Sequence, residues 1–403
     1  MAAHLTILIL SALLVATSSL EVNKVGRLTE VFAWKQLTYD IDEYTRMDSR
    51  YTHTLFFSVN QTDAFFTQYN NVPMGVERVG NRVFITVPRR RYGIPSTLNY
   101  VDYNEEKNPR SPALKPYPDI QQARRLTSVY RTRADKCNRL WMVDTGLLEI
   151  PNNPQQVQPP AIVIFDLNTD SQLLRYQFKD EDIPAANTPT GLASITVDVK
   201  SDCASAYAYI PDLTTFGLIV YSLKDNDSWR ITHSYFHFNP VAGNLNVAGR
   251  SFQWSDGIFS LTIKETDGEC NMAYFHPLIS HHEFAVSTCV LNNSTAIQDP
   301  NYWALYSVVG ERGDDTQSTM HAHHKNSNVI FYAEIGRSAV TCWNTAKPLK
   351  PANVAVLAKD TTRLSYPSDL HVSGDEVWVM ANSLPRFSYS QLDTSEYNFF
   401  VYR

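Results

Sequence analysis

The hydrophobic pattern of the chain is a series of short apolar segments, most of which carry an aromatic residue, and turn residues separate them. This pattern lacks the sustained 3.6-residue period of amphipathic helices. The six clearest segments are rich in β-branched and aromatic residues, as strands are, and they lie at 83–87, 140–144, 206–210, 273–275, 330–334 and 377–380. They recur about every 60 residues, a period typical of propeller blades with four strands each.

This recurrence predicts an all-β fold, a six-bladed β-propeller with a central channel. Radial stacking buries both faces of each small sheet, which no isolated sheet achieves. Further strands are expected at 161–165 and 217–221, and the strand-like ends of the chain, 32–37 and 397–402, are expected to pair in one blade. The alternative is a two-sheet sandwich or two β domains. No linker rich in Gly, Ser or Pro divides the chain, which favours a single domain over residues 20–403.

The N-terminus has the pattern of a signal peptide. An apolar run at 5–15 precedes the small residues Ala16, Ser18 and Ser19, so residues 1–19 are expected to be removed by cleavage near Ser18 or Ser19. The run is about half of the roughly 20 residues that a membrane-spanning helix needs. We therefore expect a secreted, extracellular protein without a membrane anchor.

Cysteines and glycosylation sequons agree with this compartment. The five cysteines lie far from any C-x-x-C spacing, and disulfides are the default outside the cell. Cys137 and Cys203 each precede an equivalent predicted strand and are expected to pair. The pairing of Cys270, Cys289 and Cys342 stays open, and one cysteine must remain unpaired. The sequons predict glycosylation at Asn60, Asn226, Asn292 and Asn293.

Composition and charge limit the classes of partner that the protein is expected to bind. The chain is 43% hydrophobic and 19% charged, as folded globular proteins are, and its net charge of −6 comes from 35 basic and 41 acidic residues. A nucleic-acid partner would need a basic face, and the only dense basic run is 89–91. No phosphate-binding glycine loop, redox cofactor motif or Ser-His-Asp order is visible. We expect a monomer without a cofactor that binds neither nucleic acid nor membrane.

Several ordered motifs resemble one known family. They are PMGVE at 73–77, RVFITVPR at 82–89, GIPSTL at 93–98, CNRLWMVDTG at 137–146, SDGIF at 255–259, FHPL at 275–278, EFAVST at 283–288, VGERG at 309–313, CWN at 342–344, YPSD at 366–369 and VWVM at 377–380. Through them the chain resembles the insect yellow/major royal jelly protein family over nearly its whole mature length. The resemblance implies a secreted six-bladed propeller with a central channel. Family members include dopachrome-converting enzymes, pigmentation proteins, salivary amine binders, nutritive proteins and eggshell proteins, so function must be argued from the site.

The ends of the recurrent strands supply the first candidate site residues: Asp144, Asp212, His276, Glu334 and Asn382. Propellers bind ligands at the channel mouth, where strands from several blades end. Carboxylates there would attract a cationic amine and could move protons, and an imidazole titrates near neutral pH. His276, Glu334 and Asp144 are thus catalytic candidates and Asp212 a ligand-binding candidate. The structural alternative is that these side chains hydrogen-bond to turns and neighbouring blades.

Other ligand-binding candidates come from the resemblance. Matching motifs with the amine-binding salivary members selects Ser368, Asn382 and Leu384. Leu384 replaces an aromatic residue and so removes a cation–π surface, which weakens the amine-binding interpretation. From the residues themselves, one arginine of 89–91 is a candidate for holding a ligand carboxylate. We name Arg89 as the ligand-binding candidate of this run. A solvated turn is the alternative.

The histidines at 321, 323 and 324 form the densest cluster of possible metal ligands. His321 and His323 alternate along a predicted strand, so they would share a face. No third ligand stands at a spacing that completes a site, and an exposed hairpin explains the cluster equally well. We expect no metal.

The leading functional hypothesis is melanin or cuticle pigmentation chemistry in the channel, with conversion of dopachrome by tautomerisation or decarboxylation. It follows from the resemblance, and the residues are compatible with it. The ligand would be a small aromatic molecule: dopachrome, a catecholamine or another biogenic amine. The alternatives are a non-catalytic binder of such amines and a structural protein of cuticle or eggshell.

Overall fold

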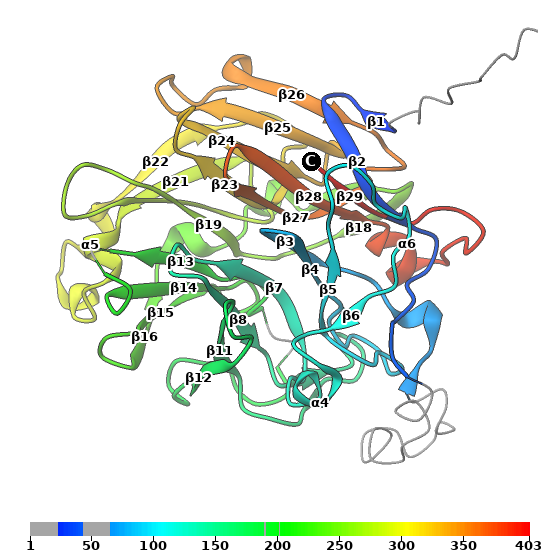
Figure 1. Cartoon of the computed structure of the whole chain (residues 1–403). Helices are drawn as coiled ribbons and strands as arrows, with labels where there is room; N and C mark the ends of the chain where they lie inside the picture. Colours follow the sequence, from blue (N-terminus) through cyan, green and yellow to red (C-terminus); the bar gives the residue numbers. More distant parts are fainter. Residues whose placement is uncertain (1–22, 43–64, 189–190, 201) are drawn as a thin grey trace, which may run out of the picture.

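The computed structural model describes residues 23–42, 65–188, 191–200 and 202–403. The predicted signal peptide and the sequon at Asn60 lie outside these residues. Five four-stranded antiparallel sheets and one five-stranded sheet surround a central axis as the six blades of a β-propeller, which confirms the predicted fold (Figure 1).

The first three blades follow the chain from its innermost to its outermost strand. Blade one contains β3 (Gly75–Val79), β4 (Arg82–Thr86), β5 (Leu98–Asp102) and β6 (Lys115–Pro116). Blade two contains β7 (Val129–Ala134), β8 (Arg139–Asp144), β11 (Ala161–Asp166) and β12 (Gln172–Gln177). Blade three contains β13 (Thr196–Val199), β14 (Ala206–Asp212), β15 (Gly217–Ser222) and β16 (Asp227–Thr232).

The other three blades complete the ring. Blade four contains β19 (Ile258–Lys264), β20 (Met272–Pro277), β21 (His282–Ser287) and β22 (Tyr306–Glu311). Blade five contains β23 (Ser318–His324), β24 (Val329–Glu334), β25 (Ala339–Asn344) and β26 (Val354–Lys359). Blade six contains β27 (Tyr366–Ser373), β28 (Glu376–Asn382), β29 (Phe399–Tyr402) and β2 (Leu28–Trp34), with β1 (Lys24–Val25) at its edge. Each of the six recurrent segments of the sequence is the second strand of a blade.

Short elements lie between or beside the blades. The hairpin of β9 (Leu147–Leu148) and β10 (Gln155–Gln156) belongs to blade two, and that of β17 (Asn244–Val247) and β18 (Arg250–Gln253) precedes blade four. The α-helices of the described residues are α4 (Ile120–Ala123), α5 (Thr288–Leu291) and α6 (Leu384–Tyr389). Among the described residues, no helix has the length and apolar character needed to span a bilayer.

Strand β8 explains why the sequences of the inner blade strands are continuous apolar runs. Side chains alternate between the two faces of a strand. Leu140 and Met142 pack with Phe84 of blade one, whereas Trp141 and Val143 pack with residues of blade three such as Ile210. A blade between two neighbours has no solvent-facing side along its inner strands, so both sets of positions are apolar.

The two ends of the chain close the ring in blade six, as predicted. β2 pairs antiparallel with β29, with Phe32 opposite Val401 and Trp34 opposite Phe399. The indole nitrogen of the fully buried Trp34 donates a hydrogen bond to the carbonyl oxygen of Pro112, 2.8 Å away. The N-terminal strand is therefore an integral part of the last blade.

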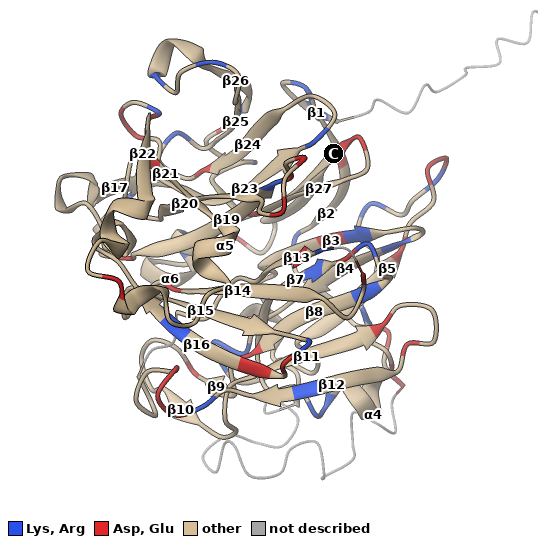
Figure 2. Cartoon of the chain, turned by 90° about the vertical axis from the view of Figure 1, so that its left-hand side faces the viewer, with Lys and Arg blue, Asp and Glu red and all other residues tan. Residues whose placement is uncertain are grey.

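The structure contains two disulfides, and both join residues that lie next to strand ends. Cys137 pairs with Cys203, joining the turns that precede β8 and β14 and confirming the predicted bridge. Cys270 pairs with Cys289 across blade four, and the half-buried Cys342 remains unpaired. Figure 2 shows acidic and basic residues interspersed on the strands and loops that it draws in colour.

We expect Trp34→Ala to lower the free energy of unfolding by about 3–5 kcal/mol, because it removes a fully buried side chain from the closing blade. Denaturant unfolding followed by circular dichroism measures this. Trp303→Ala is the matched control, since Trp303 is 67% exposed and should change stability little. Equal effects of the two substitutions would contradict the role of the β2–β29 closure.

Candidate functional site

A cavity of about 300 Å³ lies at the channel mouth where the innermost strands begin. We call it the mouth pocket. Loops and strand starts from several blades line it: Met74, Arg90, Arg91, Tyr130, Arg131, Ile150, Pro151, Asn152, Ala193, Leu213, Thr214, Trp254, Asp256, Phe259, Tyr366, Leu384, Phe387, Ser388 and Tyr389. Its volume suits a small molecule with one or two rings.

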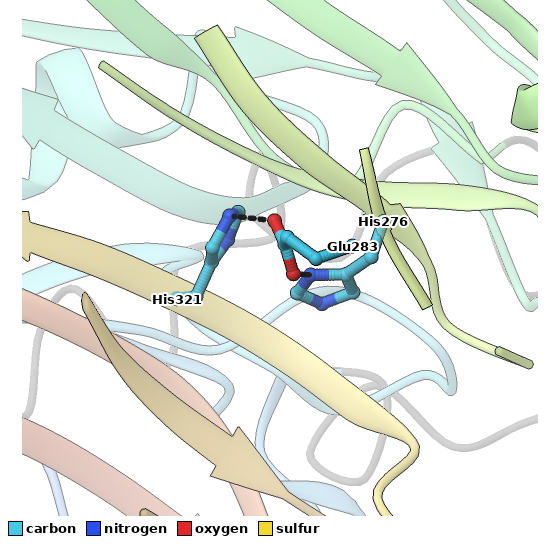
Figure 3. Close-up of side chains that lie close together, drawn as sticks. All are labelled: His276, Glu283 and His321. Carbon is cyan, nitrogen blue, oxygen red and sulfur yellow. Dashed lines mark hydrogen bonds and ion pairs between the residues drawn. The ribbon is translucent and has the colours of Figure 1, made fainter. Parts of the chain in front are cut away.

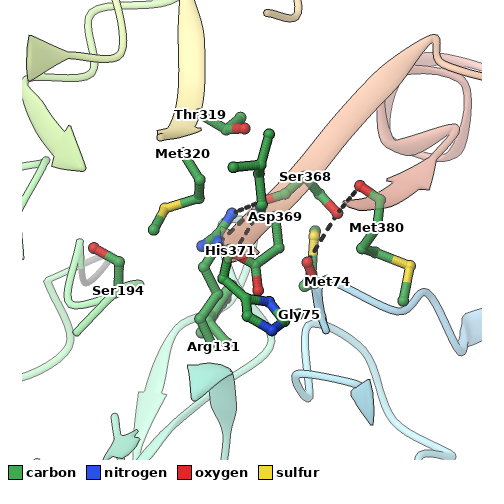
Figure 4. Close-up of polar contacts among 12 residues, drawn as sticks. Met74, Gly75, Arg131, Ser194, Thr319, Met320, Ser368, Asp369, His371 and Met380 are labelled. Carbon is green, nitrogen blue, oxygen red and sulfur yellow. Dashed lines mark hydrogen bonds and ion pairs between the residues drawn. The ribbon is translucent and has the colours of Figure 1, made fainter. Parts of the chain in front are cut away.

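The floor of the mouth pocket contains buried polar side chains. Arg131 of β7 donates hydrogen bonds to the carbonyl oxygens of Ser368 (3.0 Å) and Ala193 (2.7 Å), and its guanidinium lies over the Phe259 ring, 4.8 Å from the centroid. Asp369 lies next to Arg131 (Figure 4). Its carboxylate accepts hydrogen bonds from Arg133 and from the Val76 amide. A second cavity, lined in part by His371, lies on the other side of these residues.

Aromatic side chains form much of its wall. The indole nitrogen of Trp254 donates to the hydroxyl of Tyr389 on α6 (2.7 Å), and the rings of Trp254 and Tyr366 meet edge to face at 6.1 Å between centroids. α6 thus packs over the mouth. Such a wall favours a flat, conjugated ligand.

Asp256 is the carboxylate of this pocket, directly before the first strand of blade four. Within the described part of the chain, no group forms a hydrogen bond or ion pair with its carboxylate. Burial raises the pKa of Asp256 to about 6, against a lowering by the nearby positive charge of Arg90. A carboxyl group with this pKa is ionised at neutral pH yet basic enough to accept a proton from a ligand.

Three consecutive arginines differ in what they contact. Arg89 donates hydrogen bonds to four backbone carbonyls, those of Ile94, Pro95, Leu126 and Thr127, and so has a structural task. The guanidinium of Arg91 stacks on the Phe387 ring at 3.8 Å and donates to the Phe387 carbonyl. Arg90 lines the pocket, and its guanidinium has no hydrogen-bond partner among the described residues. Arg90 is therefore available for a ligand anion.

Tyr366 supplies a hydroxyl to the same pocket. Burial raises its pKa to about 12, with Arg131 opposing the shift and Asp256 reinforcing it. The hydroxyl consequently stays protonated at neutral pH and can donate a hydrogen bond to a ligand oxygen. Asp256, Arg90 and Tyr366 together give the pocket a base, a cation and a neutral donor.

Most strand-end residues selected from the sequence lie outside this pocket. Asp144 accepts hydrogen bonds from the amides of Thr127 and Ser128 and pairs with Arg175 of the outermost strand at 3.1 Å. Asp212 makes the equivalent pair with Arg230 of blade three at 3.0 Å. Both carboxylates therefore bind an arginine on the outermost strand of their own blade.

Glu334, Ser368 and Asn382 are also bound within the protein. Burial raises the pKa of Glu334 to about 6, and its carboxylate lies 3.3 Å from Arg337. Ser368 donates to the carbonyl oxygen of Met74, and Asn382 donates to that of Pro73. Ser368 and Asn382 therefore support the loop that precedes β3 and supplies Met74 to the mouth pocket. Of the residues selected for ligand binding, only Leu384 lines the pocket.

His276 belongs to a fully buried cluster between blades four and five. Its Nδ1 lies 3.0 Å from Glu283, whose other carboxylate oxygen lies 3.0 Å from Nε2 of His321 (Figure 3). Glu283 is the third potential metal ligand that the sequence had not revealed. However, Arg312 donates to Glu283 at 2.9 Å and already supplies a positive charge, and both nitrogens of His276 face protein oxygens. This charge environment disfavours a divalent cation, so we assign the cluster to inter-blade packing.

Asp256 lies in the SDGIF motif, just before an innermost strand, whereas the candidates expected from the sequence lie at the ends of the second strands. The position of this motif is the sequence signal that points to Asp256. Loops that precede the innermost strands supply Trp254 and Asp256, and the loop after β4 supplies Arg90.

The fold and the site define a six-bladed β-propeller with an aromatic-lined pocket at one channel mouth, and this pocket carries an aspartate and arginines. A family model described as "Major royal jelly protein" matches residues 127–403. The chain is 41% identical over 395 residues to "L-dopachrome tautomerase yellow-f" of Drosophila melanogaster, covering 93% of this chain and 91% of that protein. It is 37% identical over 407 residues to "Protein yellow" of Drosophila pseudoobscura pseudoobscura, covering 98% of this chain and 69% of that protein.

The chain belongs to the yellow/major royal jelly protein family, as its motifs indicated. Among solved structures, virginiamycin B lyase of Staphylococcus aureus aligns with a TM-score of 0.42 at 9% identity over 83% of this chain and 95% of that chain. That likeness carries no functional information.

We expect Glu283→Gln to lower the free energy of unfolding by about 3–5 kcal/mol, because it leaves the buried Arg312 without its counter-charge. Denaturant unfolding measures the change. In the control variant Glu311→Gln, the side chain is 57% exposed and pairs only distantly with His282. If Glu283→Gln were as stable as this control, the buried cluster would not contribute to blade packing.

Proposed function

We propose that the mouth pocket binds dopachrome and converts it by proton transfer, as part of pigmentation chemistry outside the cell. One observation carries this proposal: a carboxylate and a guanidinium that form no side-chain hydrogen bond to any described residue, those of Asp256 and Arg90, line one aromatic-walled cavity. The similarity over nearly the full length to a protein named L-dopachrome tautomerase supports the choice of substrate.

Each free group matches one part of dopachrome. Arg90 pairs with the carboxylate, and the wall containing Trp254 and Phe259 contacts the fused rings. Asp256 accepts a proton from a carbon of the five-membered ring, and the electron pair moves into the quinone. A quinone oxygen takes up a proton, with Tyr366 positioned to donate a hydrogen bond to it. The product is an isomer of the substrate if the carboxylate is kept, and it is lighter by carbon dioxide if decarboxylation accompanies the transfer.

Two features of the chain agree with an extracellular location. Two disulfides are formed, and the sequon residues Asn226 and Asn293 are exposed. Asn292 is half-buried and accepts a hydrogen bond from Tyr209, so we favour Asn293 over Asn292 as the glycan site. Mass spectrometry of the protein secreted from insect cells tests both the removal of residues 1–19 and the glycan positions.

We expect Asp256→Asn to slow dopachrome conversion by about 10²–10⁴-fold in kcat, because the amide cannot accept the proton. Loss of the visible absorbance of dopachrome, measured above the buffer rate, gives the activity. Glu106→Gln changes an exposed carboxylate outside the pocket and should keep the wild-type rate. Full activity of Asp256→Asn would overturn the assignment, and so would a wild-type protein no faster than buffer. If calorimetry then showed tight binding of dopamine or serotonin, the non-catalytic amine binder would replace the enzyme.

The rate of dopachrome conversion should also fall when the pH is lowered. Asp256 acts as a base only when ionised, and burial raises its pKa to about 6. We therefore expect kcat/KM to be constant above about pH 7 and to fall tenfold per pH unit well below 6. A pH–rate profile of the wild-type protein checks this. A rate that rose on acidification would assign the essential group to an acid rather than to ionised Asp256.

A further inference from the structure

The free groups of the mouth pocket recognise chemical features that are not confined to dopachrome. Arg90 fits a carboxylate, Tyr366 fits a carbonyl oxygen, and Asp256 fits an acidic C–H. The aromatic wall fits any flat ring. A substrate with these four features in one small molecule should therefore react in the same way.

The charges of the pocket favour an anion. Arg90, Arg91 and Arg131 all line it, and Asp256 is its only carboxylate among the described lining residues. Arg91 and Arg131 are held by backbone carbonyls, which accept hydrogen bonds but do not cancel their charge. Amines are consequently disfavoured relative to aromatic acids of the same size.

The catalytic groups lie within electrostatic reach of one another. Arg90 lowers the pKa of Asp256 and also that of Tyr366, while the charge on Asp256 raises that of Tyr366. Base, cation and hydroxyl therefore act on one bound molecule. The cavity of about 300 Å³ exceeds the volume of a single ring with a three-carbon acid chain.

We propose that the mouth pocket also catalyses keto–enol tautomerisation of aryl-2-oxo acids, with Asp256 as the proton carrier and Arg90 as the carboxylate anchor. This activity rests on the same roles that the proposed function gives these residues. It extends the substrate class from a fused-ring quinone to open-chain aromatic oxo acids such as phenylpyruvate.

The reaction needs no oxidant, reductant or second substrate. Asp256 removes a proton from the benzylic carbon next to the carbonyl. The C–H electron pair forms the carbon–carbon double bond of the enol, and the carbonyl π pair moves to oxygen. Tyr366 donates a hydrogen bond to that oxygen as charge develops, and the proton carried by Asp256 is delivered there directly or through water. Asp256 returns to its ionised form, and the product is an isomer of the substrate.

Proton NMR of phenylpyruvate in deuterated buffer provides the test, because every enolisation at the benzylic carbon exposes it to deuterium. We expect the wild-type protein to accelerate this exchange and the appearance of the near-ultraviolet enol absorbance. Asp256→Asn should lose at least about 10²-fold of the acceleration, and Glu106→Gln should lose none. Arg90→Gln should raise KM for phenylpyruvate about tenfold or more. The exchange of phenylacetone, which lacks the carboxylate, should not be accelerated.

The two activities can fail separately. Conversion of dopachrome without any acceleration of phenylpyruvate exchange would overturn the wider substrate class and leave the proposed function standing. Acceleration of phenylpyruvate exchange alone would support the inference and remove dopachrome as the substrate. Exchange that persisted in Asp256→Asn, or that was equally fast for phenylacetone, would contradict the roles given to Asp256 and Arg90. Circular dichroism of each variant confirms that it is folded.

Discussion

The pairing of β2 with β29 is the interaction on which the rest of the structure depends. It joins a strand from the N-terminal part of the chain to the last described strand in one blade, so the ring of six sheets has no open end. Each blade buries its inner strands only because a neighbour stands on either side, as the two faces of β8 show. An open ring would expose those faces at two blades and would separate the loops that meet at the channel mouth.

Closure of the ring also brings the mouth pocket together. Its residues come from loops and strand starts that are distant in sequence, and they meet because the innermost strands all begin at one end of the channel. Arg131, which is held by the carbonyl oxygens of Ser368 and Ala193, forms the floor of this pocket. The resulting burial accounts for the raised pKa of Asp256, and the charge of Arg90 limits that rise. The chemistry of the site is in this sense a consequence of the architecture.

The sequence predicted the architecture well because strand burial leaves a strong, repeated signal. All six recurrent segments became second strands, the chain ends paired, and Cys137 bonded to Cys203. The candidate site was harder to predict. A carboxylate at a strand end looks the same in sequence whether it faces a ligand or, like Asp144, an arginine of the outermost strand. Likewise, nothing local distinguishes Arg89, which is bound to backbone carbonyls, from the unpartnered Arg90. These differences arise from neighbours on other blades and become visible only in three dimensions.

The chemistry proposed for the mouth pocket requires that a small aromatic acid bind there against Asp256 and Arg90. A crystal structure of the protein with indole-2-carboxylate, an unreactive aromatic acid of suitable size, would show whether this binding occurs. We expect the carboxylate on the guanidinium of Arg90, the ring against Trp254 or Phe259, and Asp256 beside the ring edge. A ligand found instead in the cavity beyond Arg131, or a mouth pocket that remains empty at saturating ligand, would contradict this expectation.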